Sequence, residues 1–418
     1  MTIIIDGTVG ANKAVVLDSS GKLPAIDGSL VTTLNATQVT TGSIATARID
    51  TGTTNGKVLV LDGSGNMPAI AAGSMTGVAA STKSASDPTI STNPATGLGT
   101  KWINTTSGEL YILTDATAGA NIWTSTGGTS GNVRPYSYAG LLYGYTSGGA
   151  APPMNDTIDK FPFASSANAT DVGNLTRGSY SHGSFGSETH GYVCGGEHGP
   201  PSTRVEKFSF TSDGNAVTLF DGFAGGNTHN QGAAGAHSET AGYLMAGWTT
   251  NDISKITFAS DGSAVDWGSL TVTTGHGSGH SSTTYGWTSH HNNVTVDRFP
   301  FASNSGAADW GDLTVSRSVH WGTSSPTHGY THGGDSTTPS IIDKFAMASA
   351  ANSTDVGDLA VDRDQAAGQS SATHGYSSTG GYTLTTMIEK VSYASDGNSV
   401  DTTADVTLQR RWPSGTEY

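Results

Sequence analysis

The chain has 418 residues, a net charge of −15 and a single cysteine, Cys194. Charged residues make up only 13% of it and hydrophobic residues 35%, while 57 residues are glycine. This composition is typical of short strands joined by tight turns, and it excludes a helix-rich fold and an intrachain disulfide framework. The 19 basic residues are scattered, so nucleic acid is not an expected partner. No apolar run approaches the roughly 18 residues of a spanning helix, so no membrane insertion is expected.

Residues 1–80 contain a repeat of their own. Residues 14–26 (AVVLDSSGKLPAI) are echoed 44 positions later by residues 58–70 (VLVLDGSGNMPAI). These segments have too few large apolar side chains to bury a core within one chain. They become stable if several identical chains share one core along an axis. We therefore predict an oligomeric anchor or shaft made of β-structure over residues 1–80.

Two shorter segments follow the predicted shaft. Residues 81–98 are rich in Ser, Thr, Ala and Pro, a composition typical of a linker. Residues 99–131 are predicted to form a small β module, an expectation that rests on the resemblance described below.

Residues 132–418 contain one motif six times, made of an aliphatic, a usually acidic and a basic residue. Its copies begin at Ile158, Val205, Ile253, Val296, Ile342 and Ile388, so successive copies lie 47, 48, 43, 46 and 46 residues apart. Each copy continues with alternating apolar residues, as in Phe161 and Phe163, which is the signal of a strand with one buried face. The acids beside Lys or Arg are expected to form partly exposed ion pairs or turn caps.

Three further markers recur between these copies. A glycine precedes an aromatic residue, as in Gly191-Tyr192, and Ser-Asp-Gly turns, as at residues 212–214, predict hairpins. The third marker is an Asp-x-Gly-x-Leu segment, after which an arginine often comes: Arg177, Arg317, Arg363 and Arg410. Each unit of about 46 residues thus offers three or four strands, and propeller blades repeat at about 40–50 residues.

We therefore predict an all-β protein whose C-terminal part, residues 132–418, is a six-bladed β-propeller-like repeat domain. The chain enters the repeat at residues 134–142 and leaves it soon after Arg410, so a strand from each end is predicted to complete one shared blade. The alternative interpretations are a repetitive β-solenoid and a set of small β modules.

Several of these segments resemble parts of known proteins. Leu23–Gly28 and Thr41–Ile44 resemble shaft segments of bacteriophage tail fibres, which are homotrimers, and Gly99–Tyr111 with Ile122-Trp123 resembles small modules of such fibres. The paired glycines and spaced aromatics resemble kelch-type propeller repeats. The Ile-Asp-Lys-Phe-Pro-Phe repeat resembles tail-associated proteins of marine and cyanobacterial phages. The resemblance implies a virion appendage, assembled in the host cytoplasm, that contacts the host surface.

Aromatic residues and histidines are the candidates for binding. Sugar rings stack on aromatic side chains, so we predict receptor binding at Trp267, Trp287, Trp310 and Trp321, and at His276, His280, His290 and His291. The alternatives are that the tryptophans fill the core between blades, and that the histidines are structural or hold a metal ion. The loops at 197–204, 225–237 and 275–293 differ most between units and are the predicted recognition loops.

The sequence therefore predicts a phage tail fibre or virion structural protein that mediates host-surface adsorption through its propeller loops. The expected partners are two further copies in a homotrimer, other tail or virion proteins at the N-terminal region, and a host-surface glycan or protein. We expect no enzymatic activity, catalytic residue, cofactor or metal. The alternatives are a virion-associated polysaccharide depolymerase, which would need paired carboxylates, and a purely structural decoration or connector protein.

Overall fold

The computed structural model describes residues 19–20, 81–127, 132–151, 153–198, 202–223, 231–248, 250–381 and 383–418. The predicted shaft at residues 1–80 lies outside the described residues, apart from positions 19 and 20. In the described ranges the regular secondary structure consists of strands without a helix, which confirms the all-β class. These ranges accordingly contain no helix of the length and apolarity that crossing a membrane requires.

The chain divides between Arg134 and Pro135 into two compact units. The first contains one four-stranded sheet of β1 (Ser81–Ser84), β2 (Lys101–Asn104), β3 (Leu110–Asp115) and β4 (Ile122–Ser125). Its core is formed by Tyr111, Leu113 and Trp123.

The predicted linker is wrong at its start, because β1 lies within it and pairs in parallel with β2. The polar residues 81–84 show no apolar alternation, and their strand is formed through main-chain pairing.

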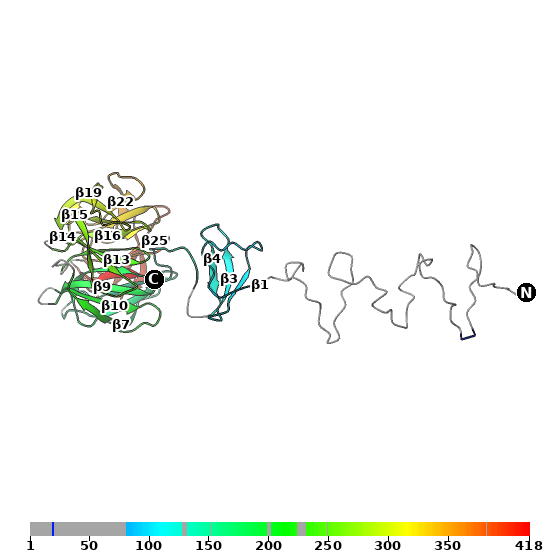
Figure 1. The fold of residues 1–418 in the computed structure, drawn as a ribbon. Coiled ribbons are helices and arrows are strands. Elements are labelled where there is room, and N and C mark those ends of the chain that lie inside the picture. Colours follow the sequence, from blue (N-terminus) through cyan, green and yellow to red (C-terminus); the bar gives the residue numbers. More distant parts are fainter. Residues whose placement is uncertain are drawn as a thin grey trace, which may run out of the picture. The chain divides into compact units, whose positions relative to one another are not determined.

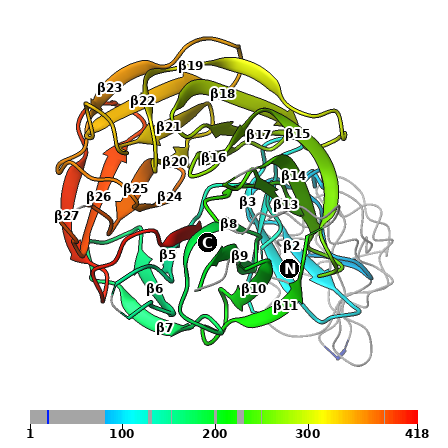
Figure 2. The same cartoon turned by 90° about the vertical axis from the view of Figure 1, so that its left-hand side faces the viewer.

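The described residues of the second unit form six four-stranded antiparallel sheets (Figures 1 and 2). Sheet 1 contains β28 (Ser414–Glu417), β5 (Tyr143–Ser147), β6 (Thr157–Pro162) and β7 (Thr170–Asn174). Sheet 2 contains β8 (Tyr180–Gly186), β9 (His190–Glu197), β10 (Arg204–Ser209) and β11 (Val217–Asp221). Sheet 3 contains β12 (Ala234–His237), β13 (Ala241–Met245), β14 (Thr250–Thr257) and β15 (Val265–Thr274).

The remaining three sheets have the same order of strands. Sheet 4 contains β16 (Ser278–Ser281), β17 (Tyr285–Ser289), β18 (Asn293–Pro300) and β19 (Ala308–Arg317). Sheet 5 contains β20 (Trp321–Ser324), β21 (His328–His332), β22 (Ile341–Ala346) and β23 (Thr354–Asp358). Sheet 6 contains β24 (Ala367–Ser370), β25 (His374–Ser378), β26 (Met387–Ser392) and β27 (Val400–Asp405).

The first strand of each sheet lies innermost, and these inner strands follow one another around a common centre. β8 contacts β12, and the contacts continue through β16, β20 and β24 to β28, which returns to β8. Figure 2 shows the arrangement end-on, with β15, β19, β23 and β27 on the perimeter. Sheet 1 joins the two ends of the repeat region, because β28 pairs with β5. The prediction of one sheet shared by both ends is therefore confirmed.

In four of the six sheets the glycine before an aromatic residue leaves space for a phenylalanine of the next strand, whereas Gly242 and Gly375 approach Phe185 and Thr323 of the preceding sheet. A Cβ at Gly191 would lie 2.3 Å from the ring of Phe208, and one at Gly329 would lie 2.2 Å from that of Phe345. The aromatic residue that follows, such as Tyr192 or Tyr330, is buried in the layer between neighbouring sheets. The Gly-aromatic pair is therefore a packing motif of the second strand in each sheet.

The acid of the aliphatic–acid–basic motif is buried, so the prediction of partly exposed pairs is wrong. Asp343 is 0% exposed and lies 2.5 Å from Arg317, which comes from the preceding sheet and is 1% exposed. The same contact joins Glu389 to Arg363 at 3.0 Å and Asp159 to Arg410 at 2.7 Å. Each arginine thus joins the third strand of one sheet to the end of the outer strand of the preceding sheet, as with Arg317, or to the connection that follows that strand, as with Arg363 and Arg410.

Arg177 does not belong to this set, although the sequence grouped it there. The equivalent acid in sheet 2, Glu206, instead accepts hydrogen bonds from the hydroxyl and backbone N–H of Thr176 and lies 3.7 Å from Arg204. In sheet 4, the equivalent Asp297 accepts from Thr271 and lies 3.1 Å from His290. The position of the acid is therefore constant, while its partner varies.

The basic residue of the motif contacts the opposite neighbour, because successive side chains of a strand point to opposite faces. Lys160 lies 3.0 Å from Asp213, Lys207 2.5 Å from Asp261 and Lys344 2.8 Å from Asp396. These three aspartates belong to the Ser-Asp-Gly turns of the following sheet. In sheets 1, 2 and 5 the acid and the adjacent lysine thus contact opposite neighbours of the sheet.

We expect Asp343→Asn to lower the free energy of unfolding by about 3–5 kcal/mol, because it leaves the Arg317 charge buried without its counter-charge. Lys344→Met is the control in the next residue, and it should cost less than about 1 kcal/mol because its ion pair is partly exposed. Urea unfolding of the full chain measures both. Equal losses of unfolding free energy for the two variants would contradict the conclusion that the buried Arg317–Asp343 pair contributes more to stability than the exposed Lys344 pair.

Candidate functional site

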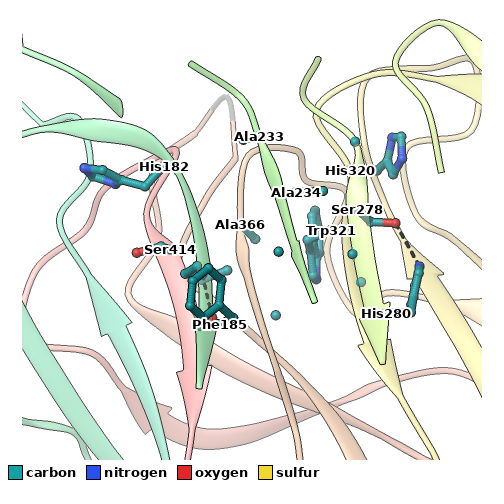
Figure 3. Close-up of a pocket in the computed structure, with 18 of the residues that line it drawn as sticks. His182, Phe185, Ala233, Ala234, Ser278, His280, His320, Trp321, Ala366 and Ser414 are labelled. Atoms are coloured by element: carbon teal, nitrogen blue, oxygen red, sulfur yellow. Dashed lines mark hydrogen bonds between the residues drawn. The ribbon is translucent and has the colours of Figure 1, made fainter. Parts of the chain in front are cut away.

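The six inner strands enclose a cavity of about 930 Å³, a volume that includes space open to solvent. Its lining is mostly glycine, alanine and serine with a few larger side chains. Figure 3 shows His182 and His320 near one end of the inner strands, with Phe185 and Trp321 further along them. Small residues are required where the strands approach closely. A Cβ at Gly279, for example, would lie 2.0 Å from the carbonyl oxygen of Gly235 in the preceding sheet.

One end of the cavity, which we call the mouth, is bounded by residues that lie just before each inner strand or, in β8, at its start. These residues form the mouth ring: Ser181, Gly232, His276, Val319, Gln365 and Trp412. All six have positive φ angles, between 47° and 66°. Backbone hydrogen bonds of 2.6–2.9 Å connect Val319 through Gln365, Trp412, Ser181 and Gly232 to His276. Positive φ is costly for Val, His and Trp, and such strain concentrates at functional sites.

Aromatic side chains from several sheets meet at this mouth. We call the set Trp248, His276, His291, Trp412 and Tyr180 the aromatic rim. The ring of His276 lies 5.1 Å from that of Trp248, 5.9 Å from that of His291 and 6.5 Å from that of Trp412, which stacks on Tyr180 at 5.3 Å. Trp248 is 53% exposed, so its indole adds accessible apolar surface beside the other rings of the rim.

The histidines of the rim are neutral at ordinary pH. Burial and the nearby imidazole of His291 lower the pKa of His276 to about 4. Burial also lowers the pKa of His291, although the carboxylate of Asp335 opposes this effect. At neutral pH the rim is therefore an uncharged aromatic surface, apart from the guanidinium of Arg411, which lies 4.8 Å from the Trp412 ring.

Residues 135–142 cover the other end of the cavity, and we call them the plug segment. Tyr138 accepts a hydrogen bond of 3.1 Å from His237 and donates its hydroxyl hydrogen to the carbonyl of Ser325, while the Gly140 N–H donates to Ser370 at 2.8 Å. These partners come from sheets 3, 5 and 6. The prediction that residues 134–142 form an entering strand is wrong, because β28 already occupies the inner position of sheet 1.

Beneath the plug segment, a belt of side-chain oxygens connects the inner strands. The N–H of His237 donates to the hydroxyl of Ser281, that of Ser281 to Ser324, and that of Ser324 to Ser370, at 2.9–3.1 Å. The N–H of Ser370 donates in turn to the carboxyl group of Glu417. Glu417 thus occupies a serine position and faces the cavity, and burial raises its pKa to about 8.

The four tryptophans predicted to bind a receptor are structural. Trp287 is 1% exposed and packs with Val296 and Phe345, and Trp321 is 5% exposed and donates a 2.7 Å hydrogen bond to Ser377 of the next sheet. The indoles of Trp267 and Trp310 donate to backbone carbonyls of the following sheet. These tryptophans therefore pack within and between the sheets, as the alternative of core packing expects, and receptor binding at these positions stays a prediction.

Trp267 and Trp310 also have a definable role beside the basic residue of the motif. Lys255 lies 3.8 Å from the ring centre of Trp267, and Arg298 lies 3.8 Å from that of Trp310. The turns that follow in sheets 4 and 5, at residues 302–306 and 348–352, have no aspartate to pair with these cations. A cation–π contact within the sheet thus replaces the ion pair between sheets.

The four predicted histidines separate into two pairs. His276 and His291 belong to the aromatic rim, whereas His280 and His290 are 1% and 0% exposed and bind neighbouring strands. The described residues contain no group of three or more His, Cys, Asp or Glu side chains arranged to hold a metal ion. Parts of the three predicted recognition loops meet at the mouth, at residues 197–198, 231–232, 275–277 and 290–292.

Trp248, Trp412 and Tyr180 were missed by sequence reasoning. A usable signal existed for Trp248, because it follows Ala246-Gly247, whereas most other units have a glycine pair that no aromatic residue follows; Tyr382 after Gly380-Gly381 is the exception. Trp412 precedes β28 and Tyr180 begins β8, and they lie together because these two inner strands, far apart in the sequence, are neighbours around the cavity. Comparison of the sequence with models of known protein families and with curated proteins gave no match.

We expect Glu417 to contribute stability that is lost as the pH rises from about 4.5 to about 8, while buried histidines such as His237 and His280, whose pKa values burial lowers to about 4, change the stability of the whole chain in the opposite direction. Its folded pKa is raised above the ordinary value of 4.5, so the folded state binds the proton more tightly, and this contribution is lost across that window. Urea unfolding at several pH values measures it. The stability of Glu417→Gln relative to the native chain should increase with pH, whereas Glu239→Gln, exposed at the same end, should show no such trend. A pH-independent difference for Glu417→Gln would contradict the account.

Proposed function

We propose that the second unit is a six-bladed β-propeller and that the chain is a receptor-binding structural subunit of a bacteriophage tail fibre or related virion appendage. The observation that supports binding most directly is the aromatic rim, with its half-exposed Trp248 at the cavity mouth. An exposed indole beside neutral imidazoles is a surface on which sugar rings stack. The assignment to a phage rests on the resemblance of the shaft, module and repeat segments.

In this proposal the two parts of the chain have separate tasks. Residues 1–80 anchor the protein to other tail or virion proteins and form a homotrimer, which presents three rims to the host surface. Simultaneous engagement of several weak sites raises the effective affinity without a strong single contact. Sedimentation equilibrium of the full chain tests the assembly: three times 42.5 kDa is expected, and 42.5 kDa would contradict it.

A polysaccharide depolymerase is the second candidate, and the cavity lends it less support. Hydrolysis of a glycosidic bond ordinarily uses two carboxylates about 5–10 Å apart. Among the described residues that line the cavity, Glu417 is the only carboxylate, and it lies at the plug end. Release of reducing ends from host polysaccharide by the full chain would favour this candidate over simple adsorption.

Trp248→Ala should weaken adsorption of the full chain to host cells by about tenfold or more, because loss of one central aromatic contact commonly removes over 1 kcal/mol. Adsorption of fluorescently labelled protein to a panel of marine bacterial and cyanobacterial cells measures this. Leu141→Ala is the matched control, since Leu141 is 47% exposed on the plug segment. Retained adsorption by Trp248→Ala, or an equal loss in the control, would overturn the proposed site.

A further inference from the structure

We infer that the aromatic rim selects uncharged glycans and rejects acidic ones, an inference that rests on the proposed function. It follows from the carboxylates that flank the rim. On one side, Glu197 accepts hydrogen bonds from Gln231 and from the hydroxyl of Tyr180, and the backbone N–H of Trp248 donates to the carbonyl of Gln231 at 3.0 Å. Glu197 is therefore connected to both ends of the rim.

On the other side of the rim lie two aspartates. Asp335 is exposed, and its charge raises the pKa of His291 and of Asp364. Asp364 is 0% exposed and accepts a 2.6 Å hydrogen bond from the side chain of Gln365 in the mouth ring. Two cations act on neighbouring groups: Arg411 lies on Trp412 and interacts with Asp364 and Tyr180, and Arg177 interacts with His182.

These groups suit a neutral sugar. Its hydroxyl groups can donate hydrogen bonds to Glu197 and Asp335 while one face of the ring lies on Trp248. A uronate or sulfated sugar would instead bring its own negative charge beside these carboxylates, on a chain with a net charge of −15. Repulsion of this kind both weakens the bound state and slows the approach of the ligand.

The rim histidines do not compensate for the carboxylates. Imidazolium groups would attract an acidic sugar, but the pKa of His276 is about 4 and burial also lowers the pKa of His291. Arg411 provides the cation of the rim that stays charged, and it is already placed over the Trp412 ring. The selectivity against acidic ligands therefore holds across the neutral pH range.

The test uses the full chain and envelope polysaccharide from a host that it adsorbs to, separated by anion exchange into an uncharged flow-through and a retained acidic fraction. We expect binding to the flow-through, loss of this binding by about tenfold or more in Trp248→Ala, and little change between about 20 and about 500 mM NaCl. Binding that depends on Trp248 but occurs only with the acidic fraction would overturn the inference and leave the proposed function standing. Binding independent of Trp248 in both fractions, or no binding to either, would overturn the proposed site itself.

A charge-neutralised variant gives an independent measurement. Glu197→Gln combined with Asp335→Asn keeps hydrogen-bond acceptors at both positions while removing two negative charges. We expect it to bind the flow-through fraction within about threefold of the native chain and to gain binding to the acidic fraction of about tenfold or more at low salt. No gain for the acidic fraction would show that the carboxylates do not determine selectivity. The Trp248→Ala measurement above then still decides the proposed function.

Discussion

The contact on which the second unit depends is the buried pair of an arginine and a carboxylate between neighbouring sheets. A charge in a protein interior is tolerated only when a counter-charge and hydrogen bonds surround it. Asp343 satisfies this condition with Arg317 and with the hydroxyl of Thr314, both from the preceding sheet. The two sheets are thereby fixed in register, because neither group has another partner for its charge at that depth.

The adjacent basic residue extends the same constraint in the other direction. Since Asp343 and Lys344 point to opposite faces of β22, one connects sheet 5 to sheet 4 and the other to sheet 6. Where the following turn lacks an aspartate, Lys255 and Arg298 stack on a tryptophan of their own sheet instead. These contacts lie within and between the sheets, so the residues that precede the inner strands are free to differ. They range from Gly232 to Trp412 around one hydrogen-bonded ring.

The sequence predicted the positions of the strands better than it predicted which side chains are buried and what they contact. The spacing of the motif beginning at Ile158 located the third strand of each sheet, and the position of Arg410 near the C-terminus led to the shared sheet. The burial of the acid in the motif could not be inferred in the same way. Asp159, for example, pairs with Arg410, about 250 positions away in the sequence. The motif therefore showed an acid beside a lysine without revealing that the acid faces a different sheet.

The candidate site was harder to predict for a related reason. Trp287 and Trp310 are buried at marker positions that recur from unit to unit. Trp248, in contrast, occupies a position whose residue type varies between units. Residues 134–142 precede the repeat and match its spacing, yet the inner position was already taken by β28, so they cross the end of the cavity instead. Competition between the two ends of a chain for one position is decided by packing, which a sequence pattern does not describe.

The central claim is that recognition occurs at the mouth of the cavity and not at the plug end or on the outer strands. Hydrogen–deuterium exchange of the full chain, with and without the host envelope fraction that it binds, tests this most directly. The account predicts increased protection at residues 180–182, 246–248, 275–277, 290–292 and 411–413. Protection confined to the plug segment or to the outer strands, with these residues unchanged, would contradict it.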